Sequence, residues 1–197
     1  TSVILHKRTA YEDWEDPERK RDLLRLWLAG MAVYSLAVKP IYTTKALLVG
    51  SAVAGLLVSL GFALIPTDRP RTLMAAESIV IFSFLLHVMG HAVGLYAKIS
   101  FYDKILHFVV PAGVAYAVYA LSQSTRWIWP WTRIRPAETA LYLFCIIVTF
   151  GVVWELFEFG TDVLFGTHEQ GDNMDTMMDM LADVSGALLG SDWDGRL

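Results

Sequence analysis

The segment that decides the fold is ALLVGSAVAGLLVSLGFALI, which occupies residues 46–65 and contains no charged side chain. A helix needs about 20 apolar residues to cross the roughly 30 Å of hydrocarbon in a bilayer. The composition agrees, because 55% of the 197 residues are hydrophobic, 18% are charged and the mean hydropathy is +0.44. A soluble core of this size would leave too much apolar surface in water. The sequence therefore predicts an integral membrane protein.

Five further apolar stretches flank this segment, and turns rich in proline, glycine and charged residues separate them. We predict an all-α fold, a polytopic helical membrane bundle with about six transmembrane helices. The predicted spans cover residues 23–38, 46–65, 73–97, 105–122, 140–154 and 176–190. The first is short, and the last begins with carboxylates. Residues 1–22 mix acids and bases and are predicted to form an aqueous or interfacial arm, with a single helical membrane domain over residues 23–197.

The positions of Lys and Arg predict the orientation, because basic loops resist translocation. With the N-terminus inside, twelve of the 16 bases fall on the inner side. The outer loops then hold only Lys39, Lys45, Lys98 and Lys104. We expect a multi-pass protein of the inner (plasma) membrane with a cytoplasmic N-terminus. Trp127, Trp129 and Trp131 would anchor it at the inner interface.

Charge and cysteine content exclude some classes of protein. The net charge of -4 and the pI of about 5.7 argue against nucleic acid as a partner. The single cysteine, Cys145, excludes an intramolecular disulfide and a four-cysteine zinc site. Lipids, and other membrane protein subunits, are the expected partners.

Histidines and carboxylates gather at the predicted outer ends of four helices. Ionisable side chains at membrane depth are expensive, so each is a functional candidate. Residues four apart share a helix face. The pairs and runs with this type of spacing are His87 and His91; Asp103 and His107; Glu155, Glu158 and Asp162; and Asp172, Asp175, Asp179 and Asp183. The topology was predicted from Lys and Arg alone, so the clustering of histidines and carboxylates at one depth is an independent observation.

So many carboxylates repel one another unless cations neutralise them, and Lys104 is the only base nearby in the sequence. We therefore expect a divalent metal ion, or a pair of ions, of unknown identity. Carboxylates with imidazole suit zinc, iron or manganese, and carboxylates alone suit magnesium or calcium. The candidate ligands are Asp103, His107, Glu155, Glu158, Asp179 and Asp183. His107 is also a candidate acid or base in catalysis, and Pro111 removes the amide that would bond its carbonyl.

Several of these residues have a purely structural alternative. His87 and His91, beside Gly90 and Gly94, would equally suit hydrogen bonds across a close helix contact, and axial ligation of a haem or chlorin is a weaker alternative. Asp172 and Asp175 would also suit a solvated loop. Asp179 and Asp183 share a face with Gly186 and Gly190, so that face is both polar and close-packed. The methionines Met174, Met177, Met178 and Met180 indicate a lipid-facing or packing surface, and His6 and His168 are predicted to be exposed.

Three motifs carry a resemblance to a known family. They are YDKILHF at residues 102–108, WELFE at 154–158, and the run from GDNMDT at 171–176 through Asp179 to Gly186 and Ala187. Together they resemble the bacterial inner-membrane family typified by YjdF and, more distantly, the VanZ-like group. The resemblance implies a multi-helix membrane protein and groups the acids with His107 in one site. YjdF-like members have no established activity, and VanZ-like proteins are associated with glycopeptide resistance. His87 and His91 lie outside these motifs.

Two classes of function follow. The first is a metal-dependent membrane enzyme that acts on a lipid-linked or amphiphilic substrate at the outer leaflet. The alternative is a non-catalytic accessory subunit of a larger membrane protein complex, in which the buried polar groups specify the fold. A proton- or cation-coupled carrier would use the same acids.

Overall fold

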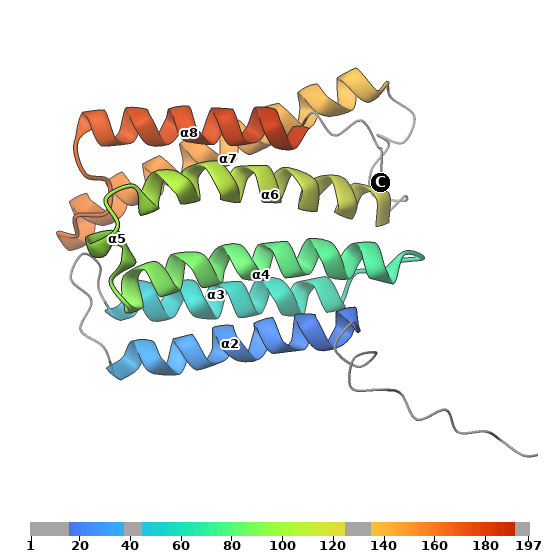
Figure 1. Ribbon diagram of the computed structural model, residues 1–197, viewed down its shortest axis with the longest axis horizontal. Helices are drawn as coiled ribbons and strands as arrows, with labels where there is room; N and C mark the ends of the chain where they lie inside the picture. The colour runs from blue at the N-terminus through green and yellow to red at the C-terminus, as the bar shows by residue number, and fades with distance from the viewer. Residues whose placement is uncertain (1–15, 38–44, 125–134, 192–197) are drawn as a thin grey trace, which may run out of the picture.

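The computed structural model describes residues 16–37, 45–124 and 135–191, and all regular structure among them is helical. The helices are α2 (Pro17–Ala37), α3 (Lys45–Ala63), α4 (Pro70–Ala92), α5 (Leu95–Lys98), α6 (Tyr102–Ser124), α7 (Pro136–Phe165) and α8 (Asn173–Ser191). The six long helices run alternately up and down one bundle, and the short α5 lies at one end (Figure 1). The predicted all-α membrane bundle with six long helices is confirmed.

Three of the described helices are long and apolar enough to cross a membrane: Pro70–Ala92, Tyr102–Gln123 and Ala137–Phe165. Leu47–Ala63 is a shorter apolar helix. Some predicted boundaries were wrong. The span predicted over residues 73–97 breaks after Ala92, because Gly94 adopts a left-handed conformation with φ of 72° and starts α5. The span predicted over 140–154 continues to Phe165, past its carboxylates. The three tryptophans of the predicted inner anchor and His6 lie outside the described residues.

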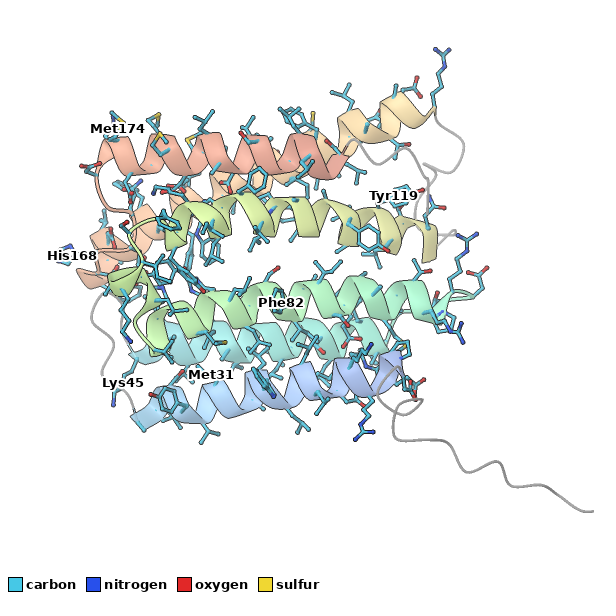
Figure 2. The ribbon with its side chains drawn as sticks, viewed as in Figure 1. Met31, Lys45, Phe82, Tyr119, His168 and Met174 are labelled. Carbon is cyan, nitrogen blue, oxygen red and sulfur yellow. The ribbon has the colours of Figure 1, made fainter. Side chains whose placement is uncertain are left out.

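The outer surface of the bundle is apolar, as a lipid environment requires. On α7, Leu141, Phe150 and Leu164 are each more than half exposed, and on α8 Met174 is 69% exposed (Figure 2). An apolar surface this extensive is unusual for a monomeric soluble protein. The exposed methionines at the start of α8 agree with the lipid-facing interpretation, and His168 is exposed as predicted.

Helices α6 and α8 approach each other so closely that their contact requires glycine. A Cβ atom at Gly186 would overlap the carbonyl oxygen of Phe108, and one at Gly190 would lie 2.6 Å from the carbonyl oxygen of Ala112. Small residues four apart allow this kind of backbone contact between membrane helices. The contact brings the polar faces of α6 and α8 together at the end of the bundle where α5 lies.

A buried polar cluster joins α2, α3 and α4 toward the opposite end of the bundle. Glu77 is 2% exposed and accepts hydrogen bonds from the Arg25 guanidinium and from Ser59 Oγ, the latter at 2.5 Å. Arg25 Nε also donates to Ser59 Oγ at 2.8 Å. Local sequence patterns do not predict this cluster, because Arg25, Ser59 and Glu77 come from three helices whose neighbours are set only by tertiary packing.

Replacing Gly186 with alanine is expected to destabilise the bundle by about 1 to 3 kcal/mol, because α6 and α8 must move apart to admit the methyl group. Thermal unfolding in detergent measures the effect. Gly50→Ala on α3 is the matched control, since a Cβ there meets nothing within 4 Å. Equal melting temperatures for the two variants would contradict the close contact.

Glu77→Ala is expected to cost about 3 to 5 kcal/mol of stability, because it leaves the Arg25 guanidinium without its buried partner. The double variant Arg25→Met with Glu77→Met should recover much of that loss. Chemical unfolding in detergent of wild type, single and double variants checks both expectations. A single variant as stable as wild type would show that the pair contributes little.

Candidate functional site

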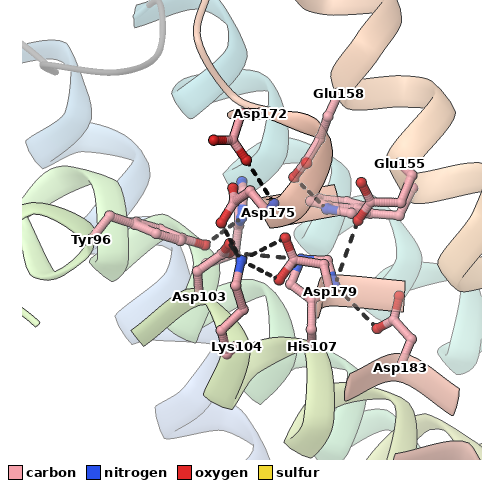
Figure 3. A network of polar contacts seen from close by, with 12 residues as sticks. Tyr96, Asp103, Lys104, His107, Glu155, Glu158, Asp172, Asp175, Asp179 and Asp183 are labelled. Carbon is pink, nitrogen blue, oxygen red and sulfur yellow. Dashed lines mark hydrogen bonds and ion pairs between the residues drawn. The ribbon is translucent and has the colours of Figure 1, made fainter. Parts of the chain in front are cut away.

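The end of the bundle that carries α5 holds a network of polar and charged side chains from four helices (Figure 3). The start of α6 contributes Asp103, Lys104 and His107, and the later part of α7 contributes Glu155 and Glu158. The first half of α8 contributes Asp175, Asp179 and Asp183, and α5 contributes Tyr96. The helical spacing predicted from the sequence places each set on one face, and the tertiary structure turns those faces toward one another.

Lys104 forms the cationic half of the network. Its Nζ lies 2.5 Å from Asp175 Oδ1, 2.7 Å from both carboxylate oxygens of Asp179, and 3.3 Å from Asp103 Oδ2. The Asp179 side chain is 2% exposed, and that of Lys104 is 27% exposed. One ammonium group therefore forms ion pairs with three carboxylates on α6 and α8.

His107 lies at the centre of the other half, and each ring nitrogen faces its own carboxylates. Nδ1 lies 3.1 Å from Asp183 Oδ1 and 3.8 Å from Glu155 Oε1. Nε2 lies 3.6 Å from Asp103 Oδ1 and 3.9 Å from Asp179 Oδ1. The histidine is 7% exposed, so its ring is held between two acidic sides away from water.

Buried carboxylate oxygens on the Nδ1 side have no hydrogen-bond partner among the described residues. Glu155 is 5% exposed and both of its side-chain oxygens are unpartnered. Asp183 is also 5% exposed, and its Oδ2 is unpartnered. Buried polar atoms are almost always hydrogen-bonded, and a native exception can mark an unseen ion or water. These oxygens therefore have capacity for a cation that the chain itself does not supply.

The donors form two candidate metal-binding groups whose atoms lie within 4.8 Å of one another. One group is Asp103, His107 and Asp179, and the other is His107, Glu155 and Asp183. The structure thus brings together five of the six predicted ligands. Glu158 belongs to neither group among the described residues; its Oε1 accepts a hydrogen bond from Trp154 Nε1 at 2.6 Å. Ligation by any of the six remains a prediction.

His87 and His91 lie beside the network. Tyr96 OH is 3.3 Å from His87 Nδ1, and the Tyr96 ring stacks on His91 with centroids 4.4 Å apart. His91 Nε2 lies 3.5 Å from Glu169 Oε2. Their placement fits the close-contact alternative, with a phenol and a carboxylate as neighbours.

Tyr96 is a member of the network that the sequence reasoning missed. Its hydroxyl points toward the acidic residues (Figure 3), and burial, reinforced by the nearby Asp103, raises its pKa well above the usual value. Gly90 makes room for it, since a Cβ there would collide with the rings of Tyr96 and Tyr102. Gly94 was the available signal, because a glycine at the end of a helix often adopts the left-handed conformation that turns the chain, here into the short α5 that carries Tyr96.

Three acids, one near the end of α7, one in the α7–α8 connection and one in the first turn of α8, have structural roles. Asp162 accepts hydrogen bonds from Thr167 Oγ1 at 2.5 Å and from the backbone amides of Glu169 and Gln170. Asp172 accepts one from the Asp175 amide at 2.9 Å and so caps α8. Asp175 then reaches Lys104. These contacts fix the loop that leads Asp179 and Asp183 into the network.

Comparison with known proteins places the chain among membrane proteins. Residues 23–196 match the family described as "Predicted membrane protein (DUF2238)". The chain belongs to this family. A protein of Thermotoga maritima described as uncharacterized is 36% identical over 105 residues, which cover 52% of this chain and 52% of that protein. The chain thus matches about half the length of that curated relative. No solved structure matches.

The structure predicts that Lys104→Met destabilises the protein by about 3 kcal/mol in the presence of a chelator, because Asp179 then stays buried without its cation. Adding Asp179→Asn to the same chain should restore part of the loss. Thermal unfolding in detergent gives the readout.

Lys98→Met is the matched control, because Lys98 lies at the same end of the bundle and its ammonium donates to a backbone carbonyl, that of Val93. If Lys104→Met melts at the same temperature as Lys98→Met, the ion pairs of Lys104 do not hold α6 to α8.

Proposed function

We propose that this membrane protein binds a divalent metal ion between α6, α7 and α8 and is a metal-dependent enzyme. The observation that supports the proposal most is Glu155, a carboxylate 5% exposed with both oxygens unpartnered, beside His107 Nδ1 at 3.8 Å. An isolated buried carboxylate is costly, and one that coordinates a metal is not. His107, Glu155 and Asp183 would be the ligands.

The opposite side of His107 is suited to a different role. Lys104 already lies against Asp179 and Asp103 there, so those carboxylates have a cation. A ligating histidine usually presents its second N–H to a carboxylate, which fixes the ring and raises its basicity as a ligand. Asp103 and Asp179, 3.6 and 3.9 Å from Nε2, are placed to orient the ring in this way. In this arrangement His107 is a ligand and does not act as the acid or base.

The donor set fits a transition metal. One imidazole and two carboxylates suit zinc, manganese or iron, and three protein ligands leave positions open for water and substrate. A bound ion would polarise a phosphoryl or carbonyl oxygen, or activate a water molecule. Glu158, one turn beyond Glu155, remains a candidate for a further ligand or for a proton-transferring group.

The depth of the site favours a lipid-linked or amphiphilic substrate. His107 lies five residues into α6, or about 8 Å along the helix axis, so a headgroup can reach the site while its chains stay in the bilayer. The distribution of Lys and Arg supports a cytoplasmic N-terminus in the inner membrane, which would place the site at the outer leaflet. The motifs that resemble the YjdF-like and VanZ-like groups include all of the proposed ligands.

Chelator-stripped protein in detergent is expected to bind one Zn²⁺ or Mn²⁺ per chain, and Glu155→Gln is expected to weaken that binding about 100-fold or more. Isothermal titration with elemental analysis measures both. Glu138→Gln, an exposed change at the far end of the same helix, is the control. Glu158→Gln decides whether Glu158 is also a ligand.

Failure to bind either ion, or equal affinity of Glu155→Gln and wild type, would contradict the proposal. The buried polar groups would then act as a fold-specifying network, as the alternative of a non-catalytic accessory subunit requires.

A further inference from the structure

An open apolar groove lies on a different side of the bundle, between α2, α4 and α6. It encloses about 340 Å³, which is within the range of ligand sites. Its walls include Leu24, Ile79, Phe82, Leu86, Val109 and Gly113, and Phe82 marks its position in Figure 2. The hydroxyl of Ser83, a polar member of the lining, donates to the Ile79 carbonyl of its own helix. The groove thus offers almost no hydrogen-bonding group to a ligand.

The surroundings of the groove define the chemistry of its occupant. Two of its three walls, α4 and α6, are helices long and apolar enough to cross the membrane. The groove follows α4 from Ser78 to Leu86, a length of about 12 Å at 1.5 Å per residue. A ligand that enters from the side therefore comes from the hydrocarbon region, and an acyl chain has the shape and polarity of the space.

Basic residues lie near the N-terminal ends of α2 and α4, at one end of the groove. Lys20 and Arg21 precede Leu24 by four and three residues, so they lie on the groove face of α2. Arg71 precedes Ser78 by seven residues, or two turns and about 10 Å, and is exposed. Arg21 is engaged by two carboxylates, because it contacts Asp22 at 3.1 Å and its Nε lies 3.9 Å from Glu77 Oε2. The exposed Lys20 and Arg71 therefore supply the positive charge at the end of the groove toward the headgroup region.

We propose that this groove binds one anionic phospholipid. An acyl chain occupies the space between Leu24, Phe82 and Val109, and the phosphate lies between Lys20 and Arg71. Basic pockets between transmembrane helices recognise anionic headgroups in this way, and each base near the surface adds to the attraction. The proposal does not depend on a metal, because the groove shares no residue with the acidic network.

Native mass spectrometry of detergent-purified, delipidated protein titrated with phosphatidylglycerol or phosphatidylcholine tests the proposal. Wild type is expected to bind one phosphatidylglycerol in preference to phosphatidylcholine. Lys20→Ala combined with Arg71→Ala should weaken phosphatidylglycerol binding about 25-fold and leave phosphatidylcholine unchanged. Arg19→Ala with Arg135→Ala removes the same charge from exposed positions, one on another face of α2 and one at the start of α7, and should leave the preference intact.

A second pair of variants tests the groove itself. Ser83→Phe fills it and should abolish the single tight lipid site. Ser185→Phe is its control, because Ser185 is exposed on α8 and its hydroxyl likewise bonds only its own helix, at Leu181. Equal binding of the two lipids by wild type, or wild-type binding by Ser83→Phe, would overturn the proposal. Unaltered thermal unfolding of the variants shows that lipid loss does not reflect misfolding.

Discussion

The close approach of α6 and α8 is the constraint on which the polar site depends. Gly186 and Gly190 let the two backbones meet, and one to two turns away the charged faces of the same helices are forced into contact. Lys104 then reaches Asp175 and Asp179, and His107 reaches Asp183. Steric fit and ion pairing thus act on the same pair of helices. Any change that separates the backbones removes cations from buried carboxylates as well as contacts from the core.

The two halves of the bundle use their buried charge differently. In the half formed by α2, α3 and α4, Arg25, Ser59 and Glu77 satisfy one another, which is what a structural cluster in a membrane requires. In the half formed by α6, α7 and α8, Lys104 serves three carboxylates while Glu155 keeps two unpartnered oxygens. This asymmetry favours a metal site in the second half only.

The sequence predicted the helices and the sharing of helix faces, because both follow from local periodicity. The four-residue spacing of Asp103 and His107, and of Asp179 and Asp183, needs no tertiary information. The convergence of these faces followed from the predicted depth of each residue in the membrane. Three features depend on helix packing, so no local sequence pattern predicts them. They are the orientation of His107 between two pairs of carboxylates, the position of Tyr96 against Gly90, and the ion pair of Glu77 with Arg25. The apolar pattern includes Gly94 in the span predicted over residues 73–97, because glycine is common within transmembrane helices.

The proposed metal centre is tested most directly by an anomalous-difference map from crystals of the protein grown with Mn²⁺ or Zn²⁺, collected at the absorption edge of the ion. The account predicts one strong peak within coordination distance, about 2.0 to 2.2 Å, of His107 Nδ1 and of oxygens of Glu155 and Asp183. A peak at another place in the chain, or ordered water alone between these three side chains, would contradict it.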